Sequence, residues 1–205
     1  MDTWIIVVIV IVAIVVILAV SIIGWWISTM NWFRRTKVKV DESLSGVDVA
    51  LTKRYDLLTK LLSATKGYAK HEYETLVGVI SLRGNGEKDG GKELKSSDDL
   101  KNLNLDQKGE LNSRLNEVQK GLNIMVENYP NLKADSTFNN LMNQTGEVEE
   151  RLQASRRVYN SNVSSFNQKR VSFPASIVAH HIGFNNDLEF FKADEEKRAD
   201  VKFDF

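Results

Sequence analysis

The sequence predicts an all-α protein: one N-terminal transmembrane helix, followed by an elongated antiparallel bundle of three long helices and a shorter C-terminal fourth. Three observations predict this fold class. An unbroken apolar run opens the chain, apolar residues further along recur at helical spacing, and the 205 residues contain only two prolines, Pro130 and Pro174. With so few helix breakers, long helices are the expected elements.

Residues 1–33 are predicted to form a membrane anchor. Residues 5–20 carry no polar side chain, and Ser21 and Gly24 are the only interruptions before Ile27. About 24 helical residues would reach about 36 Å, more than the hydrocarbon thickness of about 30 Å. A buried core helix would rarely be so uniformly apolar. A cleaved signal peptide is disfavoured, because no basic residue precedes the run and the bulky pair Trp25-Trp26 follows it.

The flanks of the run predict where it meets the membrane surface and how it is oriented. Tryptophans at both ends match an aromatic belt, and basic residues occur only on the C-terminal side. The positive-inside rule therefore predicts a single-pass protein of the cell membrane, with its N-terminus outside and its soluble domain in the cytoplasm. The predicted membrane-interface residues are Trp4, Trp25, Trp26, Trp32, Arg34, Arg35, Lys37 and Lys39.

Composition excludes some classes of function. The chain has 27 basic and 27 acidic residues, and no Lys or Arg precedes Arg34. The part after the anchor is thus close to neutral, which argues against nucleic acid as a partner. Cysteine is absent, so disulfides, thiolate metal sites and a thiol nucleophile are excluded.

A first long helix is expected from about residue 38 to residue 82. No proline interrupts it, and no Pro or Gly separates Ile27 from Ser45, so it should continue from the membrane helix. A glycine-rich loop follows at residues 84–91; it lacks the motifs of a phosphate-binding loop. Residues Ser97 to Asp99 are a candidate helix cap. The apolar positions of this first helix are Leu44, Val47, Leu51, Tyr55, Leu58, Leu62, Ala69, Leu76 and Ile80.

The next helix is predicted to end at Pro130. A short link to Asp135 then leads to Ser136 and Thr137, which are candidate N-cap residues of the following helix. The apolar positions of the helix before the link recur in steps of four and three: Leu111, Leu115, Val118, Leu122, Met125 and Tyr129.

The third long helix is expected from about residue 137 to residue 173. A sustained seven-residue repeat predicts coiled-coil-like packing against other helices. Pro174 then breaks the chain, residues 175–182 form the short fourth helix, and Gly183 stops it. The bundle domain is assigned to residues 34–191 and a charged tail to residues 192–205. The repeat positions are Phe138, Thr145, Leu152, Tyr159, Phe166 and Phe173, with Leu141, Val148 and Ser155 beside them.

The second half of this helix supplies a candidate interaction or packing face. Its rings recur on one face without convergent titratable groups, so we expect an interface and not an active site. Packing within the monomer is favoured, because Phe138 and Leu152 lie on the same face. The residues assigned to it are Tyr159, Asn160, Phe166, Asn167, Phe173 and Pro174.

Several segments resemble the LemA family, in the family's order and over nearly the whole chain. They read ALTKRYDLL at residues 50–58, KGYAKHE at 66–72, and ENYPNLKA at 127–134 with Phe138 and Leu141 after it. Further matches are Tyr159-Asn160, Phe166-Asn167, Phe173-Pro174, Ala179 and Gly183-Phe184. One departure is that the family usually has Ile-Pro-Asn where this chain has Leu58-Thr59-Lys60, which puts the proline bend expected there in doubt.

The resemblance implies a helical bundle on a single N-out anchor, and little biochemistry. The family has no generally assigned activity. Some members resemble proteins of bacterial membrane-organelle formation, and some are encoded beside membrane proteases. These are associations and do not define a mechanism.

Candidate chemistry in the bundle is sparse. His71-Glu72 begins like HExxH, but Thr75 stands where the second His belongs, and the pair His180-His181 lacks identifiable partners. We therefore expect no metal, no cofactor and no catalytic residue. Arg54, Asp56, Asn160 and Asn167 flank the apolar positions. They form either a recognition surface or, as we favour, hydrogen bonds between helices that fix the register.

The leading hypothesis is a noncatalytic, membrane-anchored scaffold or interaction protein. Its expected partners are the lipid membrane, further copies of the chain in a homo-oligomer, or another membrane protein. The alternatives are a metal-dependent enzyme built within the bundle and a regulator of a membrane protease or other membrane partner.

Overall fold

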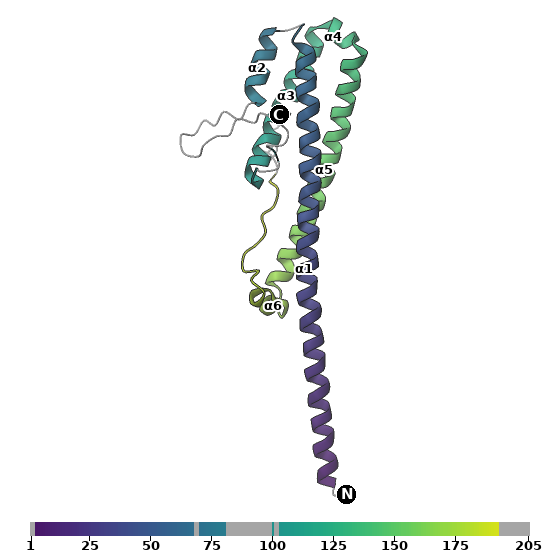
Figure 1. Ribbon diagram of the computed structural model, residues 1–205, viewed down its shortest axis with the longest axis vertical. Coiled ribbons are helices and arrows are strands. Elements are labelled where there is room, and N and C mark those ends of the chain that lie inside the picture. The colour runs from purple at the N-terminus through teal and green to yellow at the C-terminus, as the bar shows by residue number, and fades with distance from the viewer. Residues whose placement is uncertain (1–2, 68–69, 81–99, 101–102, 193–205) are drawn as a thin grey trace, which may run out of the picture. The chain divides into compact units, whose positions relative to one another are not determined.

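The computed structural model describes residues 3–67, 70–80, 100 and 103–192, and no strand occurs among them. Its helices are α1 (Thr3–Thr65), α2 (Lys70–Ile80), α3 (Leu105–Asn128), α4 (Pro130–Ala134), α5 (Ser136–Val171) and α6 (Ala175–His181) (Figure 1). The all-α bundle with a long apolar N-terminal helix is therefore confirmed.

Helix α1 joins the apolar run and the first bundle helix in one element of 63 residues. The expected continuity is confirmed, and the chain stays helical through Leu58-Thr59-Lys60, where the family pattern has a proline. The expected extension to residue 82 is wrong. The helix ends at Thr65, and α2 begins at Lys70. Gly67 lies in the break between them, and Gly is less favourable in a helix than Ala by about 1 kcal/mol.

The residues form two compact units. Unit 1 consists of residues 1–41 and 161–188, and unit 2 consists of residues 42–160 and 189–205. Helices α1 and α5 contribute one part to each unit, whereas α6 belongs to unit 1 and α2, α3 and α4 belong to unit 2.

In unit 2 the apolar positions of α1, α3 and α5 pack into one core. Helix α5 runs antiparallel to α1, since Arg54 contacts Glu149 and Gly46 faces Ser155. Helix α3 runs parallel to α1, because α2 makes the return between them (Figure 1). The core residues predicted from spacing and buried here are Val47, Leu51, Tyr55, Leu58, Leu62, Leu111, Leu115, Val118, Leu122, Met125, Phe138, Thr145, Val148, Leu152 and Tyr159.

The helix caps differ from those expected. Asn104 caps α3 in a reciprocal pair with Gln107, whereas the candidate cap at residues 97–99 lies outside the described residues. At the start of α5 the cap is Asp135, whose Oδ1 accepts from the N–H groups of Thr137 at 2.8 Å and Phe138 at 3.1 Å. Ser136 and Thr137 were wrong as caps, because the link before them is itself the helix α4, which brings Asp135 to the cap position.

Unit 1 has a small aromatic core where the end of α5, α6 and the following segment close on α1. The rings of Phe33 and Phe166 meet edge to face at 5.6 Å, and those of Phe166 and Phe184 at 5.1 Å. Ala175 and Ala179 bring α6 against these rings. Gly183, at φ 88°, follows the end of α6, as its predicted role in stopping the helix requires.

The seven-residue repeat of α5 holds up to Phe166 and then fails. Tyr159 and Phe166 are buried, but Phe173 is 82% exposed. Packing of Phe173 in the same core is therefore wrong. Helix α5 ends at Val171, so helical spacing no longer decides where Phe173 points. An interaction role for Phe173 and Pro174 stays a prediction.

The contrast between Phe166 and Phe173 predicts opposite effects of the same substitution. Phe166→Ala should lower the free energy of unfolding of the full chain in detergent by about 3–5 kcal/mol, because it empties a fully buried ring site. Phe173→Ala should change it by less than about 0.5 kcal/mol, because the ring is exposed. Thermal or denaturant unfolding followed by circular dichroism measures both. Equal losses in the two variants would contradict the assignment of Phe166 to the core.

Candidate functional site

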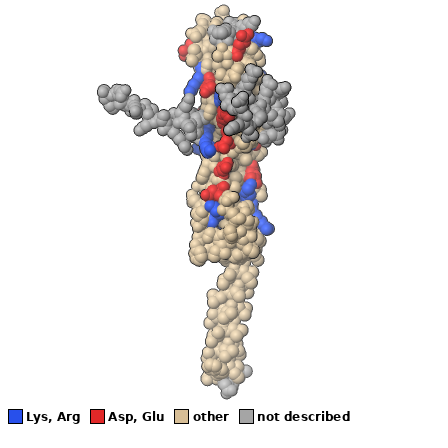
Figure 2. All heavy atoms as spheres, turned by 90° about the vertical axis from the view of Figure 1, so that its left-hand side faces the viewer, with Lys and Arg blue, Asp and Glu red and all other residues tan. Residues whose placement is uncertain are grey.

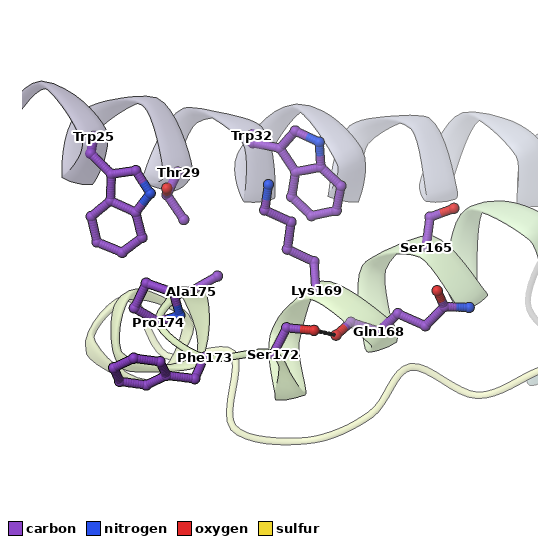
Figure 3. Close-up of a pocket in the computed structure, with 10 residues that line it drawn as sticks. All are labelled: Trp25, Thr29, Trp32, Ser165, Gln168, Lys169, Ser172, Phe173, Pro174 and Ala175. Carbon is purple, nitrogen blue, oxygen red and sulfur yellow. Dashed lines mark hydrogen bonds between the residues drawn. The ribbon is translucent and has the colours of Figure 1, made fainter.

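An open pocket lies between α1 on one side and the end of α5 with the start of α6 on the other. It has a volume of about 500 Å³ and lies wholly within unit 1 (Figure 3). Helix α1 contributes one wall and the turn from α5 into α6 contributes the other. The lining residues are Trp25, Thr29, Trp32, Ser165, Gln168, Lys169, Ser172, Phe173, Pro174 and Ala175.

One cation and two indoles dominate the chemistry of this pocket. Lys169 extends from α5 toward α1, and its Nζ lies 4.6 Å from the centre of the Trp32 ring (Figure 3). This is a cation–π contact, worth about 0.5–1 kcal/mol at an exposed site. Ser172 donates its hydroxyl to the backbone oxygen of Gln168 at 2.6 Å. Among the described residues, the lining contains hydroxyl, amide, ammonium and indole groups and neither a carboxylate nor a His. Such a set suits the binding of a polar or anionic group.

The structure brings some of the predicted membrane-interface residues to this region. Trp25 and Trp32 line the pocket, and Trp26 lies edge-on to the ring of His181 in α6, with centroids 5.4 Å apart. Trp4 lies alone near the start of α1 and is 75% exposed. Of the basic residues, Arg34, Arg35 and Lys39 are exposed, and Lys37 pairs with Asp41 one turn further along α1.

A second polar site surrounds Arg54 in the core of unit 2. The Arg54 side chain is 1% exposed, and its guanidinium donates to the side-chain oxygens of Asn112 at 2.7 Å, Asn116 at 2.7 Å and Gln119 at 2.8 Å. The Glu149 carboxylate lies 2.8 Å from Nη1. Arg54 on α1 thus binds α3 and α5 together, as the favoured alternative predicts. Asp56 is half-buried.

The partners of Arg54 were missed in the sequence, although a signal exists. Lys108, Asn112, Asn116 and Gln119 recur in steps of four and three, which places them on one face of α3 beside its apolar positions. Lys108 is also buried, and its Nζ lies 2.6 Å from the carboxylate of Asp48 on α1. A polar row at helical spacing next to a core face indicates buried contacts between helices.

Asn160 and Asn167 hold the segment that follows α6 against α5. In unit 1 the Asn167 amide donates to the backbone oxygen of Leu188 and accepts from its N–H, both at 2.9 Å. In unit 2 Asn160 makes the same pair of bonds with Phe191, at 3.0 and 2.8 Å. These side chains pair with the backbone of a non-helical segment, so the hydrogen bonds between helices predicted for Asn160 and Asn167 are wrong, and helical spacing did not reveal their partners.

The histidines do not gather with other ligands in the described part of the chain. Among those residues no group of three His, Cys, Asp or Glu side chains is placed to hold a metal ion. His180 and His181 are exposed, and the side chain of His71 lies outside the described residues. The absence of an essential metal or cofactor stays a prediction.

Comparison with known proteins gives two similarities. The model of the LemA family matches residues 43–205. The chain is also 27% identical over 178 residues to Protein LemA of Metamycoplasma hominis, an alignment that covers 86% of this chain and 74% of the relative. The family match begins after the apolar run, so the evidence for an anchor comes from the residues of this chain.

The Arg54 cluster predicts a strong dependence of stability on one cation. Arg54→Ala should lower the free energy of unfolding by about 3–5 kcal/mol, because it leaves Glu149 and three amide oxygens without their shared donor. Arg54→Lys should restore only part of this, since one ammonium cannot reproduce the planar fork of donors.

The control is Arg151→Ala, which removes an exposed Arg from α5 and should change the free energy of unfolding by less than about 0.5 kcal/mol. Chemical denaturation of the full chain in detergent provides the values. An Arg54→Ala protein as stable as the Arg151→Ala protein would show that the buried polar layer contributes nothing to the bundle.

Proposed function

The chain belongs to the LemA family, and on that premise we propose that it is a noncatalytic, single-pass membrane-anchored scaffold or interaction protein. One observation carries the proposal. Helix α1 is long and apolar enough to cross a membrane, and none of its most apolar window is buried by the other residues that the structure describes. Figure 2 shows this part of the helix as a rod with no Lys, Arg, Asp or Glu side chain on the face in view.

Lipid is the cover that best fits this rod. Burying one Val, Leu or Ile side chain contributes about 1.5–3 kcal/mol, so moving residues 5–20 out of water contributes on the order of tens of kcal/mol. A core helix of a soluble protein would gain this energy from neighbouring side chains, whereas no residue of the described ranges buries this rod. A bilayer supplies the same environment over the same length.

The orientation we propose places the N-terminus outside the cell membrane and the bundle in the cytoplasm. Arg34, Arg35, Lys37 and Lys39 follow the apolar run, and the positive-inside rule retains such residues in the cytoplasm. The bundle then serves as a helical platform at the inner surface, where further copies of the chain or another membrane protein bind. The pocket beside α1 supports a binding role, because its lining offers polar and aromatic contacts.

Anchoring and orientation are tested by cysteine labelling, for which the cysteine-free chain gives a clean background. A cysteine at Thr3 should react with an impermeant maleimide in intact cells, because it lies outside. A cysteine at Asn140, exposed on α5, should react only after the cells are permeabilised. Alkaline carbonate should leave both proteins in the membrane pellet.

A chain lacking residues 1–33 is the control and should appear in the soluble fraction. Labelling of Asn140→Cys in intact cells would contradict the orientation, and complete extraction of the full chain by carbonate would contradict the anchor.

A further inference from the structure

The turn from α5 into α6, which we call the corner (residues 171–177), carries a cluster of exposed apolar side chains. Val171 is 64% exposed, Phe173 is 82% exposed and Ile177 is 54% exposed, all within seven residues. Helix α6 already buries its opposite face through Ala175, Val178 and Ala179. Isolated exposed apolar residues are common on protein surfaces, but a cluster of this kind marks a contact.

This corner lies at a defined level along α1. Phe173, Pro174 and Ala175 share a pocket with Trp25 and Thr29 (Figure 3). One turn of α6 further on, the ring of His181 meets Trp26 at 5.4 Å. The corner is therefore beside residues 25–29 of α1, directly after the apolar run.

The rise per residue of a helix gives the depth at which residues 25–29 would lie in a membrane. If the run enters the hydrocarbon near Ile5, about 20 residues at about 1.5 Å each cross its thickness of about 30 Å and bring the boundary to about Gly24. The headgroup layer adds roughly 5–8 Å on each side, which is the length of about four or five helical residues. Residues 25–29, and the corner beside them, then lie in the headgroup layer.

The charges near the corner fit this depth. Lys169 reaches over Trp32, Arg34 and Arg35 are exposed within one turn after Trp32, and Arg170 is paired with Asp187. Figure 2 shows that, on the face in view, the surface directly next to the apolar run of α1 carries no Lys, Arg, Asp or Glu side chain. Apolar and aromatic groups at the boundary with cations just above them are typical of an interfacial contact.

We propose that the corner at residues 171–177 is a second membrane contact, which inserts Phe173 and Ile177 among the lipid headgroups beside the point where α1 leaves the bilayer. The inference rests on the proposed function, since it uses the membrane position of α1. Two contacts, one spanning and one interfacial, fix the rotation of α1 about its own axis, which a lone helix leaves free.

Single cysteines carrying an environment-sensitive fluorophore test the proposal on the full chain. The protein is reconstituted in vesicles of phosphatidylcholine and phosphatidylglycerol, with and without a lipid that bears a quencher near the headgroup end of its acyl chain. The test positions are Phe173→Cys and Ile177→Cys. The matched control is Val158→Cys, because Val158 on α5 is 54% exposed, the same fraction as Ile177. Ile14→Cys reports on the membrane run.

We expect blue-shifted emission and several-fold quenching by the lipid at positions 173 and 177, and water-like, unquenched emission at position 158. Water-like emission at both 173 and 177 would overturn the proposal. So would blue-shifted emission that the lipid does not quench and that disappears when the protein is diluted with excess lipid, because the occupant would then be a second copy.

The label at position 14 separates this inference from the proposed anchor. Quenched or blue-shifted emission at position 14 together with water-like emission at 173 and 177 rejects this inference alone, whereas water-like emission at position 14 rejects the membrane anchor itself.

Discussion

The apolar run of α1 imposes the main constraint on this protein, because no other element packs over it in the described part of the chain. Residues 5–20 carry sixteen apolar side chains in succession, and within the described residues none of this stretch is buried. Their transfer out of water outweighs the net stability of a typical domain, which is about 5–15 kcal/mol. The position of these residues also determines the position of the first bundle turns, because α1 continues from them without a break to Thr65.

The two units pack against α1 through different kinds of contact. Near the proposed membrane surface, unit 1 packs α1 through rings, with Phe33 against Phe166 and Phe184. Further along, unit 2 packs α1 through an apolar core that also buries Arg54 and Lys108. Apolar side chains alone specify the register between helices weakly. A buried guanidinium shared by oxygens from α3 and α5 tolerates few registers, so the polar layer specifies the arrangement that the apolar core stabilises.

Much of the fold could be predicted because helical spacing is a local signal. The repeat positions from Leu111 to Met125 in α3 and from Phe138 to Phe166 in α5 are buried, and the membrane run and first bundle helix are one element. The prediction failed where the local signal ended. The break near Gly67 was not seen, because an apolar repeat can continue across two helices, and Phe173 was placed in the core by extending a repeat beyond the end of its helix.

The candidate site was only partly predictable, since its contacts join residues that are distant in the sequence. Trp25 and Trp32 were singled out from their place beside the apolar run, but nothing in their spacing pointed to Lys169 or to the corner at Pro174. Asn160 and Asn167 were named, like Arg54, as candidates for hydrogen bonds between helices, but their partners are backbone groups of Phe191 and Leu188, which carry no sequence signal. Arg54 was recognised. Its partners Asn112, Asn116 and Gln119 recur at helical spacing on α3, so a search for polar residues at that spacing would find them.

We propose that α1 crosses the lipid and continues without a break as the first helix of the bundle. Spin labels placed one at a time along α1 from Val10 to Lys39, in the full chain in lipid bilayers, test it through their accessibility to oxygen and to a water-soluble nickel complex. We expect the greatest depth near the middle of the apolar run and a steady loss of depth toward Trp25. Beyond Arg34 labels should be accessible to water, with a period of about 3.6 residues preserved throughout. Water access at the middle of the run, or loss of the helical period between Gly24 and Lys39, would contradict the claim.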